Sequence, residues 1–351
     1  MKIITVPKRV TFILLALMHA GVSTASEAIV SALDRPARMI DAPSKAAQFG
    51  VAQAGNNWIT VGERGVISLS NDRGQTWRQA QSPTSVGLTA VFFLDDKLGW
   101  ATGHAGIVLG THDGGETWQK LLDGKQAAQI YVEWASRQAD PAIIEKAQQR
   151  LADGADKPFL DIYFSDSQHG IAVGAYGLAY VTRDAGRHWV PLALPNELDL
   201  HLYSVRARDG QWLIAGEQGL VLLSGDGGNS FRALSMPYEG SFFTALLPGS
   251  GAMVVAGLRG NAFQSRDGGA TWRALEVPVK ASILSAAENV NNEVLLANQA
   301  GTLFKVDGTQ LLPVAEKLPP LTGLVMIDDL HYLGTSMEGV VQVQLAPGGS
   351  L

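Results

Sequence analysis

An eight-residue phrase that recurs five times constrains the fold of this 351-residue chain more than any other sequence feature. The phrase follows the pattern S/T-x-D-x-G-x-x-W/F, and its copies occupy residues 70–77, 111–118, 182–189, 224–231 and 265–272. The terminal aromatic residues of successive copies are 41, 71, 42 and 41 positions apart. A period in the low forties is typical of β-propeller blades. The single long interval equals one period plus about 30 residues, which indicates an insertion in a regular array.

The aspartate of the phrase is expected to be structural. A short carboxylate can accept hydrogen bonds from the amides of a tight turn, and the glycine that follows adopts backbone conformations that other residues resist. The terminal aromatic residue is expected to pack into the core of its blade. The sequence therefore predicts structural Asp-box turns, and not reaction chemistry, at Asp72, Asp113, Asp184, Asp226 and Asp267.

A second motif, G-x-x-G, precedes each copy of the phrase, at residues 62–65, 103–106, 174–177, 216–219 and 257–260. Apolar runs flank it on both sides, so the motif predicts a two-residue hairpin turn between two strands. Another apolar run comes before these strands. Each unit is thus predicted to have four strands, which suits a chain with 39 glycines and only 17% charged residues.

Seven such units account for nearly the whole chain. They start near Ala46, Leu88, Leu160, Tyr203, Phe243, Leu284 and Leu324. The last unit has only three predicted strands, and we expect residues 38–40 to supply its fourth strand and so to close the ring. The predicted fold is all-β: a seven-bladed β-propeller of four-stranded antiparallel blades, forming one domain over residues 26–351.

The N-terminus has the pattern of an export signal. Lys2, Lys8 and Arg9 precede an apolar stretch of about 13 residues, followed by small residues up to Ala25. Residues 1–25 are therefore predicted to be a signal peptide, which places the protein in the periplasm; an uncleaved anchor is the alternative. The net charge of −6 argues against nucleic acid as a partner. The absence of cysteine excludes disulfides and thiolate chemistry.

Strand alternation assigns the loops to two faces. The G-x-x-G turns share one face with the connections between blades, and the Asp-box turns lie on the other. Large, varied side chains at one repeated position suggest a binding surface. The candidate partner-binding residues on this face are Glu63, Arg64, His104, Tyr176, Glu217, Gln218 and Arg259.

The insertion, residues 124–157, lies on the G-x-x-G face and is predicted to be a helical hairpin. Trp134 is one of the residues of its apolar stripe and a further candidate for partner binding. Asp140-Pro141 has the pattern of a helix start. The hairpin is either a lid or docking element over the propeller mouth, or a helix pair folded onto blades 2 and 3.

A glycan-binding or glycoside-hydrolysing protein is the alternative function, because Asp-boxes are familiar in sialidases. Glu63, Glu217 and Glu338 are the carboxylates that a two-carboxylate mechanism would use. Arg64 and Arg259 could clamp a carboxylate. However, the sialidase R-I-P motif is absent, the histidines show no metal-ligand spacing, and there is no dinucleotide or phosphate-loop fingerprint. No catalytic residue, metal or cofactor is therefore predicted.

Residues 99–118, Gly-Trp-Ala-Thr-Gly-His-Ala-Gly-Ile-Val-Leu-Gly-Thr-His-Asp-Gly-Gly-Glu-Thr-Trp, closely resemble the blade repeat of the photosystem II stability and assembly factor family. The resemblance implies a seven-bladed propeller without enzymatic activity, which helps to assemble and repair a membrane-protein complex by binding a newly made subunit through an arginine-rich surface. Arg64 and Arg259 match the arginine-bearing turns of that family. The helical insertion and the lack of a lipidated cysteine depart from it. We expect an exported, monomeric scaffold that binds a membrane-protein complex or its subunits.

Overall fold

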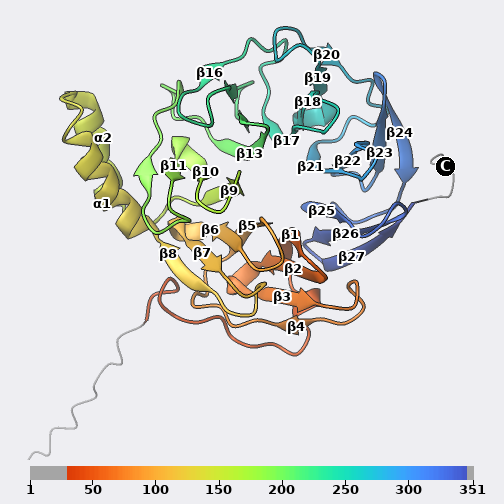
Figure 1. Cartoon of the computed structure of the whole chain (residues 1–351), viewed down its shortest axis with the longest axis horizontal. Coiled ribbons are helices and arrows are strands. Elements are labelled where there is room, and N and C mark those ends of the chain that lie inside the picture. Colours follow the sequence, from red (N-terminus) through yellow and green to blue (C-terminus); the bar gives the residue numbers. More distant parts are fainter. Residues whose placement is uncertain (1–29, 346–351) are drawn as a thin grey trace, which may run out of the picture. The chain divides into compact units, whose positions relative to one another are not determined.

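The computed structural model of this chain describes residues 30–345. Seven sheets form a ring around a central axis, and each sheet runs outward from this axis (Figure 1). Consecutive strands are antiparallel neighbours within every sheet. The prediction of a seven-bladed β-propeller is therefore confirmed. The predicted signal peptide, residues 1–25, lies outside the described residues.

The blades follow one another in chain order. Blade 1 comprises β1 (Gln48–Ala54), β2 (Asn57–Gly62), β3 (Ile67–Ser70) and β4 (Arg78–Gln79). Blade 2 comprises β5 (Leu88–Phe93), β6 (Gly99–Gly103), β7 (Val108–Thr111) and β8 (Gln119–Leu122). Blade 3 comprises β9 (Phe159–Phe164), β10 (Gly170–Gly174), β11 (Ala179–Thr182) and β12 (Val190–Pro191). Blade 4 comprises β13 (Leu202–Arg208), β14 (Gln211–Gly216), β15 (Val221–Ser224) and β16 (Arg232–Ala233).

Three blades complete the ring. Blade 5 comprises β17 (Phe242–Leu246), β18 (Met253–Gly257), β19 (Ala262–Ser265) and β20 (Arg273–Ala274). Blade 6 comprises β21 (Ile283–Glu288), β22 (Val294–Asn298), β23 (Leu303–Asp307) and β24 (Gln310–Ala315). Blade 7 comprises only β25 (Gly323–Met326), β26 (His331–Ser336) and β27 (Gly339–Gln344). Short 3₁₀ turns are η1 (Pro43–Lys45), η2 (Glu63–Gly65), η3 (His104–Gly106), η4 (Ala175–Gly177) and η5 (Leu258–Gly260).

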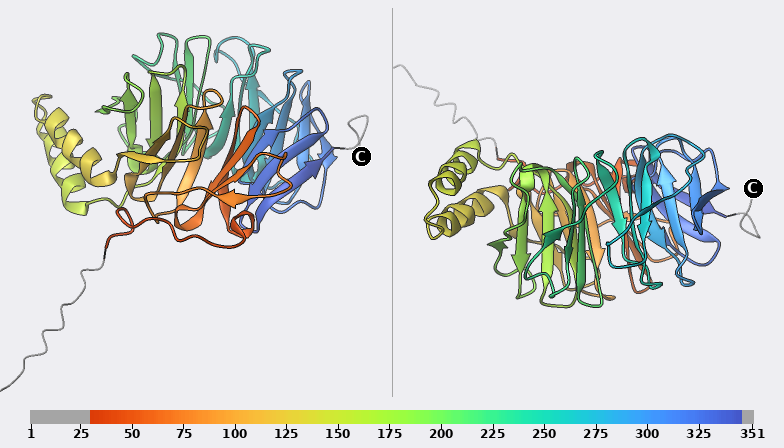
Figure 2. Two further views of the ribbon diagram at one scale, coloured as in Figure 1. Left: turned by 60° about the horizontal axis from the view of Figure 1, so that its bottom comes forward. Right: turned by 90° about the horizontal axis from the view of Figure 1, so that it is seen from above.

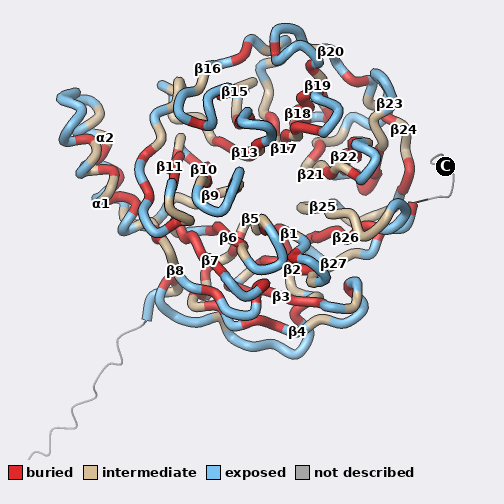
Figure 3. The backbone as a smooth tube through the Cα atoms, viewed as in Figure 1, coloured by how far each residue is buried: buried red, intermediate tan, exposed pale blue. Residues whose placement is uncertain are grey.

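The core lies between the blades. Every residue of β6, β10, β18 and β22 is buried, because both faces of these strands contact neighbouring sheets. Aromatic side chains join adjacent blades: Trp100 of blade 2 stacks on Phe164 of blade 3, and its Nε1–H donates to the Ala185 carbonyl at 3.2 Å. Exposed residues are concentrated in the loops and the helical insertion (Figure 3).

The insertion forms the predicted helical hairpin, α1 (Gly124–Ala135) and α2 (Pro141–Asp153). Asp123 caps α1 in a reciprocal capping box with Gln126, and Asp140 caps α2, which begins with Pro141. The hairpin lies beside the ring and not across it (Figures 1 and 2). The interpretation as a helix pair on blades 2 and 3 is therefore the one that the fold supports.

The segment 31–46, called the strap below, does not form the fourth strand predicted for blade 7. Ala37 N–H donates to the Ser82 carbonyl at 3.1 Å, and the Gln79 side chain hydrogen-bonds the backbone of Arg38 and Ile40, so the strap lies along blade 1. Leu33, only 4% exposed, packs into the core of blades 1 and 2 and holds the strap there. Blade 7 keeps three strands, and our prediction of strand sharing was wrong.

The ring closes instead by packing of blade 7 against β1. The hydroxyl of Thr322, a residue that precedes β25, donates to the Gln48 carbonyl at 2.8 Å.

Within residues 30–345, no helix has the length and apolar character needed to cross a membrane.

Candidate partner-binding face

The G-x-x-G motifs form one class of loop. In blade 1, Gly62 N–H donates to the Val66 carbonyl at 3.0 Å, and Val66 N–H donates to the Glu63 carbonyl at 3.0 Å. Three residues, 63–65, therefore lie between the hydrogen-bonded residues Gly62 and Val66, and the prediction of a two-residue turn was wrong. The residue before the second glycine has a positive φ in all five loops, between 51° and 57°: Arg64, Ala105, Tyr176, Gln218 and Arg259.

Each G-x-x-G loop therefore contains a left-handed residue that is not glycine. We expected the glycines alone to meet the demands of the turn, but the preceding residue also adopts a conformation that costs a side-chain-bearing residue about 1 kcal/mol. Glycine would avoid this cost. Four of the five positions nevertheless carry the large side chains of Arg64, Tyr176, Gln218 and Arg259, and all four residues are exposed. Strain that is retained at exposed positions is typical of functional sites.

The first glycine of each motif holds the loop against the inner strand. A Cβ on Gly62 would lie 2.0 Å from the Ala47 carbonyl oxygen, so only glycine allows this approach. The same carbonyl accepts a hydrogen bond from Glu63 N–H at 3.0 Å. In blade 5, Leu258 N–H bonds the Ser241 carbonyl in the same way, at 2.9 Å. The loops are thus fixed at one position per blade, and they present their side chains at repeated positions.

Glu63 and Glu217 bind within their own blades. Glu63 Oε1 accepts from Ala47 N–H at 3.3 Å, and Glu217 Oε2 accepts from His201 N–H at 3.1 Å. Glu217 Oε2 also lies 3.0 Å from His201 Nδ1. These carboxylates support the start of the inner strand, which is a structural task that the sequence pattern did not reveal.

The arginines and the histidine of the predicted set are free of such contacts. The Arg64 side chain is 86% exposed and lies 3.9 Å from the Glu63 carboxylate, which is a loose ion pair. His104 and Arg259 are also exposed. An exposed guanidinium contributes little to folding and is available to a partner.

Tyr176 belongs to a cluster that joins blade 3 to the hairpin. Its ring lies 4.8 Å from the His201 ring, and Lys157 Nζ lies 5.8 Å from the centre of the Tyr176 ring. Arg150 Nη2 donates to the Tyr176 carbonyl at 2.9 Å. The side chain of Arg150 is 9% exposed, and its guanidinium lies 4.4 Å from the centre of the Tyr131 ring. Sequence reasoning missed Arg150, because a basic residue on an amphipathic helix is normally solvated.

Trp134, the candidate from the insertion, makes its aromatic contact within the hairpin. Its ring stacks on Tyr131 with 5.4 Å between ring centres, and it is half-buried beside Ile143 in the hairpin's apolar cluster. Its partner-binding role remains a prediction.

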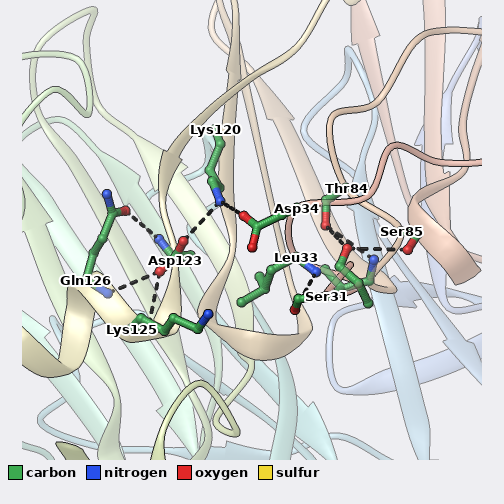
Figure 4. Close-up of polar contacts among 11 residues, drawn as sticks. Ser31, Leu33, Asp34, Thr84, Ser85, Lys120, Asp123, Lys125 and Gln126 are labelled. Atoms are coloured by element: carbon green, nitrogen blue, oxygen red, sulfur yellow. Dashed lines mark hydrogen bonds and ion pairs between the residues drawn. The ribbon is translucent and has the colours of Figure 1, made fainter. Parts of the chain in front are cut away.

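The strap contributes residues to this face that the sequence analysis did not single out. The Ala32 carbonyl accepts from Ser85 N–H at 2.9 Å and from the Thr84 hydroxyl at 3.0 Å. Lys120 Nζ bridges Asp34, at 2.7 Å, and Asp123, at 3.1 Å (Figure 4). These contacts fix the strap beside the connection from blade 1 to blade 2 and beside the start of the hairpin.

A groove of about 830 Å³ separates the strap from the G-x-x-G loop of blade 1. Three arginines line it, together with exposed apolar side chains of the strap; Met39 is 57% exposed. The lining residues are Arg35, Pro36, Arg38, Met39, Ile40, Asp41, Ala46, Glu63, Arg64, Val66 and Ser85. Arg64 is thus a predicted site residue that shares its groove with two further arginines.

The aspartates of the repeated phrase make corresponding contacts in each copy, except that the His188 ring takes the place of the Thr or Ser hydroxyl at Asp184. Asp72 accepts from the Ser70 hydroxyl at 2.8 Å, from Thr76 N–H at 2.9 Å and from the Thr76 hydroxyl at 2.5 Å. The Thr76 hydroxyl, the Thr76 amide and the Ser70 hydroxyl lower the pKa of Asp72 to about 2. Equivalent bonds are made by Asp113, Asp184, Asp226 and Asp267.

The axial channel is narrow, and its two charged lining residues pair with each other. It has a volume of about 150 Å³, and its charged lining residues are Asp161 and Arg206. These two form an ion pair with 2.5 Å between Oδ2 and Nη1, and Val205 N–H also donates to Asp161 Oδ2. No group of three or more candidate metal ligands occurs within residues 30–345.

Comparison with known proteins supports the sequence resemblance. The family model described as "Photosynthesis system II assembly factor YCF48" matches residues 140–306. The photosystem II assembly lipoprotein Ycf48 of Synechococcus sp. (strain CC9902) is 37% identical over 93 residues, which are 25% of this chain and 28% of that protein. The match therefore spans less than a third of the curated relative. The predicted resemblance to the photosystem II assembly factor family is confirmed.

Solved structures share the fold at low sequence identity. The structure of YCF48 bound to D1 peptide has a TM-score of 0.65 and 17% identity, covering 88% of this chain and 97% of the other. YCF48 from Cyanidioschyzon merolae has a TM-score of 0.62 and 14% identity, covering 88% and 98%. The WD40 propeller domain of Doa1 has a TM-score of 0.64 and 11% identity, covering 90% and 97%. At these identities the likeness shows the propeller fold alone.

Proposed function

We propose that this chain, which carries the repeat of the photosystem II assembly factor family, is a non-catalytic scaffold for the assembly or stability of a membrane-protein complex. It is exported to the periplasm, acts as a monomer and binds a subunit of the complex. The relatives support this proposal: one is named as an assembly lipoprotein, and one solved structure is that of YCF48 bound to D1 peptide.

The binding surface is the G-x-x-G face. The observation that carries this assignment is the set of left-handed, exposed residues that retain large side chains, Arg64, Tyr176, Gln218 and Arg259. His104 adds an exposed side chain on blade 2, while Glu63 and Glu217 support the loops. Around Arg64, the groove that is lined by three arginines favours a partner segment with carboxylates and some apolar side chains.

Charge reversal tests this assignment. The variant Arg64→Glu/Arg259→Glu should capture less of the membrane-protein partner from solubilised membranes, with the captured subunit identified by mass spectrometry. The thermal midpoint should change little, because both side chains are exposed. Arg266→Glu is the matched control, since it reverses an exposed charge in an Asp-box turn. Equal capture by the double variant and the wild type would overturn the assignment.

The absence of catalysis is tested separately. The purified chain should not hydrolyse sialosides or other aryl glycosides above the level of a heat-denatured sample. Hydrolysis that is abolished by Glu63→Gln or Glu217→Gln would replace the scaffold proposal by the glycosidase alternative.

A further inference from the structure

The outer edge strands of blades 1–6 have features that disfavour pairing with another chain. The outermost strands β4, β16 and β20 have two residues each and begin with arginine. The two-residue β12 ends in Pro191, β8 contains Lys120, and β24 contains Pro313. Short length, basic side chains and proline are the means by which natural edge strands avoid unwanted pairing.

Blade 7 has none of these features. Its outermost strand, β27, is six residues long, with the sequence Gly-Val-Val-Gln-Val-Gln. This strand has high β-propensity, no charge and no proline. Among the residues described, β27 pairs with β26 alone. Figure 1 shows β25, β26 and β27 in order from the axis outward.

The backbone groups of β27 that face away from β26 can be assigned from one hydrogen bond. Leu345 N–H donates to the Leu330 carbonyl at 2.8 Å, toward β26. The backbone groups of successive residues in an antiparallel strand point to opposite sides. Those of Val340, Gln342 and Gln344 therefore point outward, where they form a row of donors and acceptors.

A groove of about 400 Å³ adjoins this edge. It is lined by Gln342, Val343 and Gln344 of β27 and by the apolar side chains of Ile327 and Tyr332. Its ionisable residues, Arg73, Asp328 and His331, pair with one another. The groove therefore offers room for side chains next to the row of free backbone groups.

We propose that the outer edge of β27 binds an extended, uncharged segment of another polypeptide, which adds the missing fourth strand to blade 7. In such strand addition, main-chain hydrogen bonds supply the affinity, and an adjoining groove holds alternate side chains. The edge carries no charge, and the ionisable residues of the groove pair with one another, so the surface offers no free charge to a charged partner and suits an uncharged segment. This surface is separate from the G-x-x-G loops, and the inference does not depend on the function proposed above.

Other occupants fit less well. The strap is bound to blade 1. A second copy would meet this rim along six residues only, whereas a stable interface buries about 800 Å² per partner. A flexible segment needs only the edge and the groove.

The test uses a fluorescein-labelled heptapeptide of alternating threonine and valine and the full chain, with binding followed by fluorescence anisotropy. The wild type should bind the peptide. A peptide with N-methyl groups on alternate residues should not bind, because one of its hydrogen-bonding edges is blocked. Equal binding of both peptides would overturn strand addition.

Two variants of β27 locate the site. Gln344→Lys adds a positive charge, which disfavours pairing at an edge strand, and Gln342→Pro removes an outward N–H. Each should weaken binding of the heptapeptide about tenfold, as expected for about 1.4 kcal/mol. Gln119→Lys is the matched control, because it alters an exposed glutamine on the outermost strand of blade 2. Thermal midpoints should show that the variants fold, and Gln344→Lys keeps the test valid if Gln342→Pro does not.

Two further results would show that the tail or a second copy of the chain, and not a partner segment, occupies the edge of β27. Binding that appears only after removal of residues 346–351 would show that the tail occupies the edge and would overturn the proposal. So would a dimer, detected by sedimentation velocity, that Gln344→Lys dissociates. The Arg64→Glu/Arg259→Glu variant should bind the heptapeptide as the wild type does, which keeps failure of this inference distinct from failure of the proposed function.

Discussion

Single residues in this propeller have roles that depend on their position in the repeat. The aspartate of the repeated phrase binds its own turn through hydroxyl and amide donors. The aromatic residue that ends the phrase packs between blades: Trp118 is 5% exposed, lies edge-on to Phe93 at 5.9 Å, and donates from Nε1 to the Gly115 carbonyl. By contrast, the left-handed residues Arg64 and Arg259 face solvent, which separates stabilising positions from candidate binding positions within one unit.

Replacing Trp118 by alanine should lower the free energy of unfolding by about 3–5 kcal/mol, as for other large buried aromatic residues. Trp118 and Phe93, whose contact is lost, belong to the core shared by blades 1 and 2, which also contains Ile59. Urea denaturation followed by circular dichroism measures the change. Arg259→Ala, in an exposed loop, serves as the control and should change stability by less than about 0.5 kcal/mol. A Trp118 variant as stable as the wild type would contradict the core assignment.

The aspartates also predict a dependence of stability on pH. Hydroxyl and amide donors, the Thr76 and Thr271 hydroxyls first among them, lower the pKa values of Asp72 and Asp267 to about 2, from 3.8. A lowered pKa in the folded state contributes stability that is present above pH 3.8 and is lost as the pH falls toward 2. The thermal midpoint should therefore decline over this range. The decline should be smaller for Asp72→Asn/Asp267→Asn, and an identical decline in that variant would refute the assignment.

The helical hairpin is an element with its own core and a defined attachment. Tyr131, Ala135 and Ala147 are buried within it. It is attached to blade 3 by two hydrogen bonds: the Tyr180 hydroxyl donates to the Ala127 carbonyl at 2.7 Å, and Arg150 donates to the Tyr176 carbonyl. The second bond reaches the backbone of a G-x-x-G loop, so the hairpin supports part of the candidate binding face.

A double-mutant cycle tests this attachment. Tyr180→Phe should cost about 1 kcal/mol in the wild type, because the Ala127 carbonyl loses a buried donor. In a variant with residues 124–157 replaced by a short Gly/Ser linker, the same substitution should cost close to nothing, since the acceptor is absent. Both values come from urea denaturation. Equal costs in the two backgrounds would show that the hydrogen bond is not what attaches the hairpin. The linker variant should retain the β-sheet circular dichroism of the propeller.

At the scale of the whole molecule, the ring closes without a shared strand. Blade 7 packs against β1 through contacts such as the Thr322–Gln48 hydrogen bond. The strap stabilises blades 1 and 2 instead, through Leu33 and the Asp34–Lys120 ion pair. The two ends of the described chain therefore have different tasks: the N-terminal end covers one side of blade 1, and the C-terminal end leaves the β27 edge open.

The strap assignment predicts a local loss of stability. Leu33→Ala should lower the free energy of unfolding by about 2–5 kcal/mol, since the side chain is buried in the core of blades 1 and 2. Hydrogen exchange should accelerate first in β4 and β5 and not in β25–β27. Met39→Ala, at an exposed strap position, is the control and should have little effect. If hydrogen exchange accelerated only in blade 7, the result would contradict the strap assignment and would favour closure of the ring by a strand shared with blade 7.

The sequence alone determined the number of blades, the four-stranded unit, the place of the insertion and its helical form. The reason is that these properties are local and repeated: a period of about 41 residues, apolar runs of strand length and the helix start at Asp140-Pro141 each appear directly in the order of residues. The family resemblance followed from the same repeat, because residues 99–118 contain both the G-x-x-G motif and the eight-residue phrase.

Only the tertiary structure decided the features that depend on contacts between distant residues. The strap was expected on blade 7, but the buried site for Leu33 lies between blades 1 and 2, which no local pattern indicates. Arg150 is buried because Tyr131 and the Tyr176 carbonyl surround it, although its helix has the pattern of a solvated one. Glu63 and Glu217 accept hydrogen bonds from the backbone at the start of the inner strand, and these contacts with residues distant in sequence likewise appear only in the folded chain. Local sequence specifies which strands form, whereas packing between blades decides which side chains and edges remain free to bind.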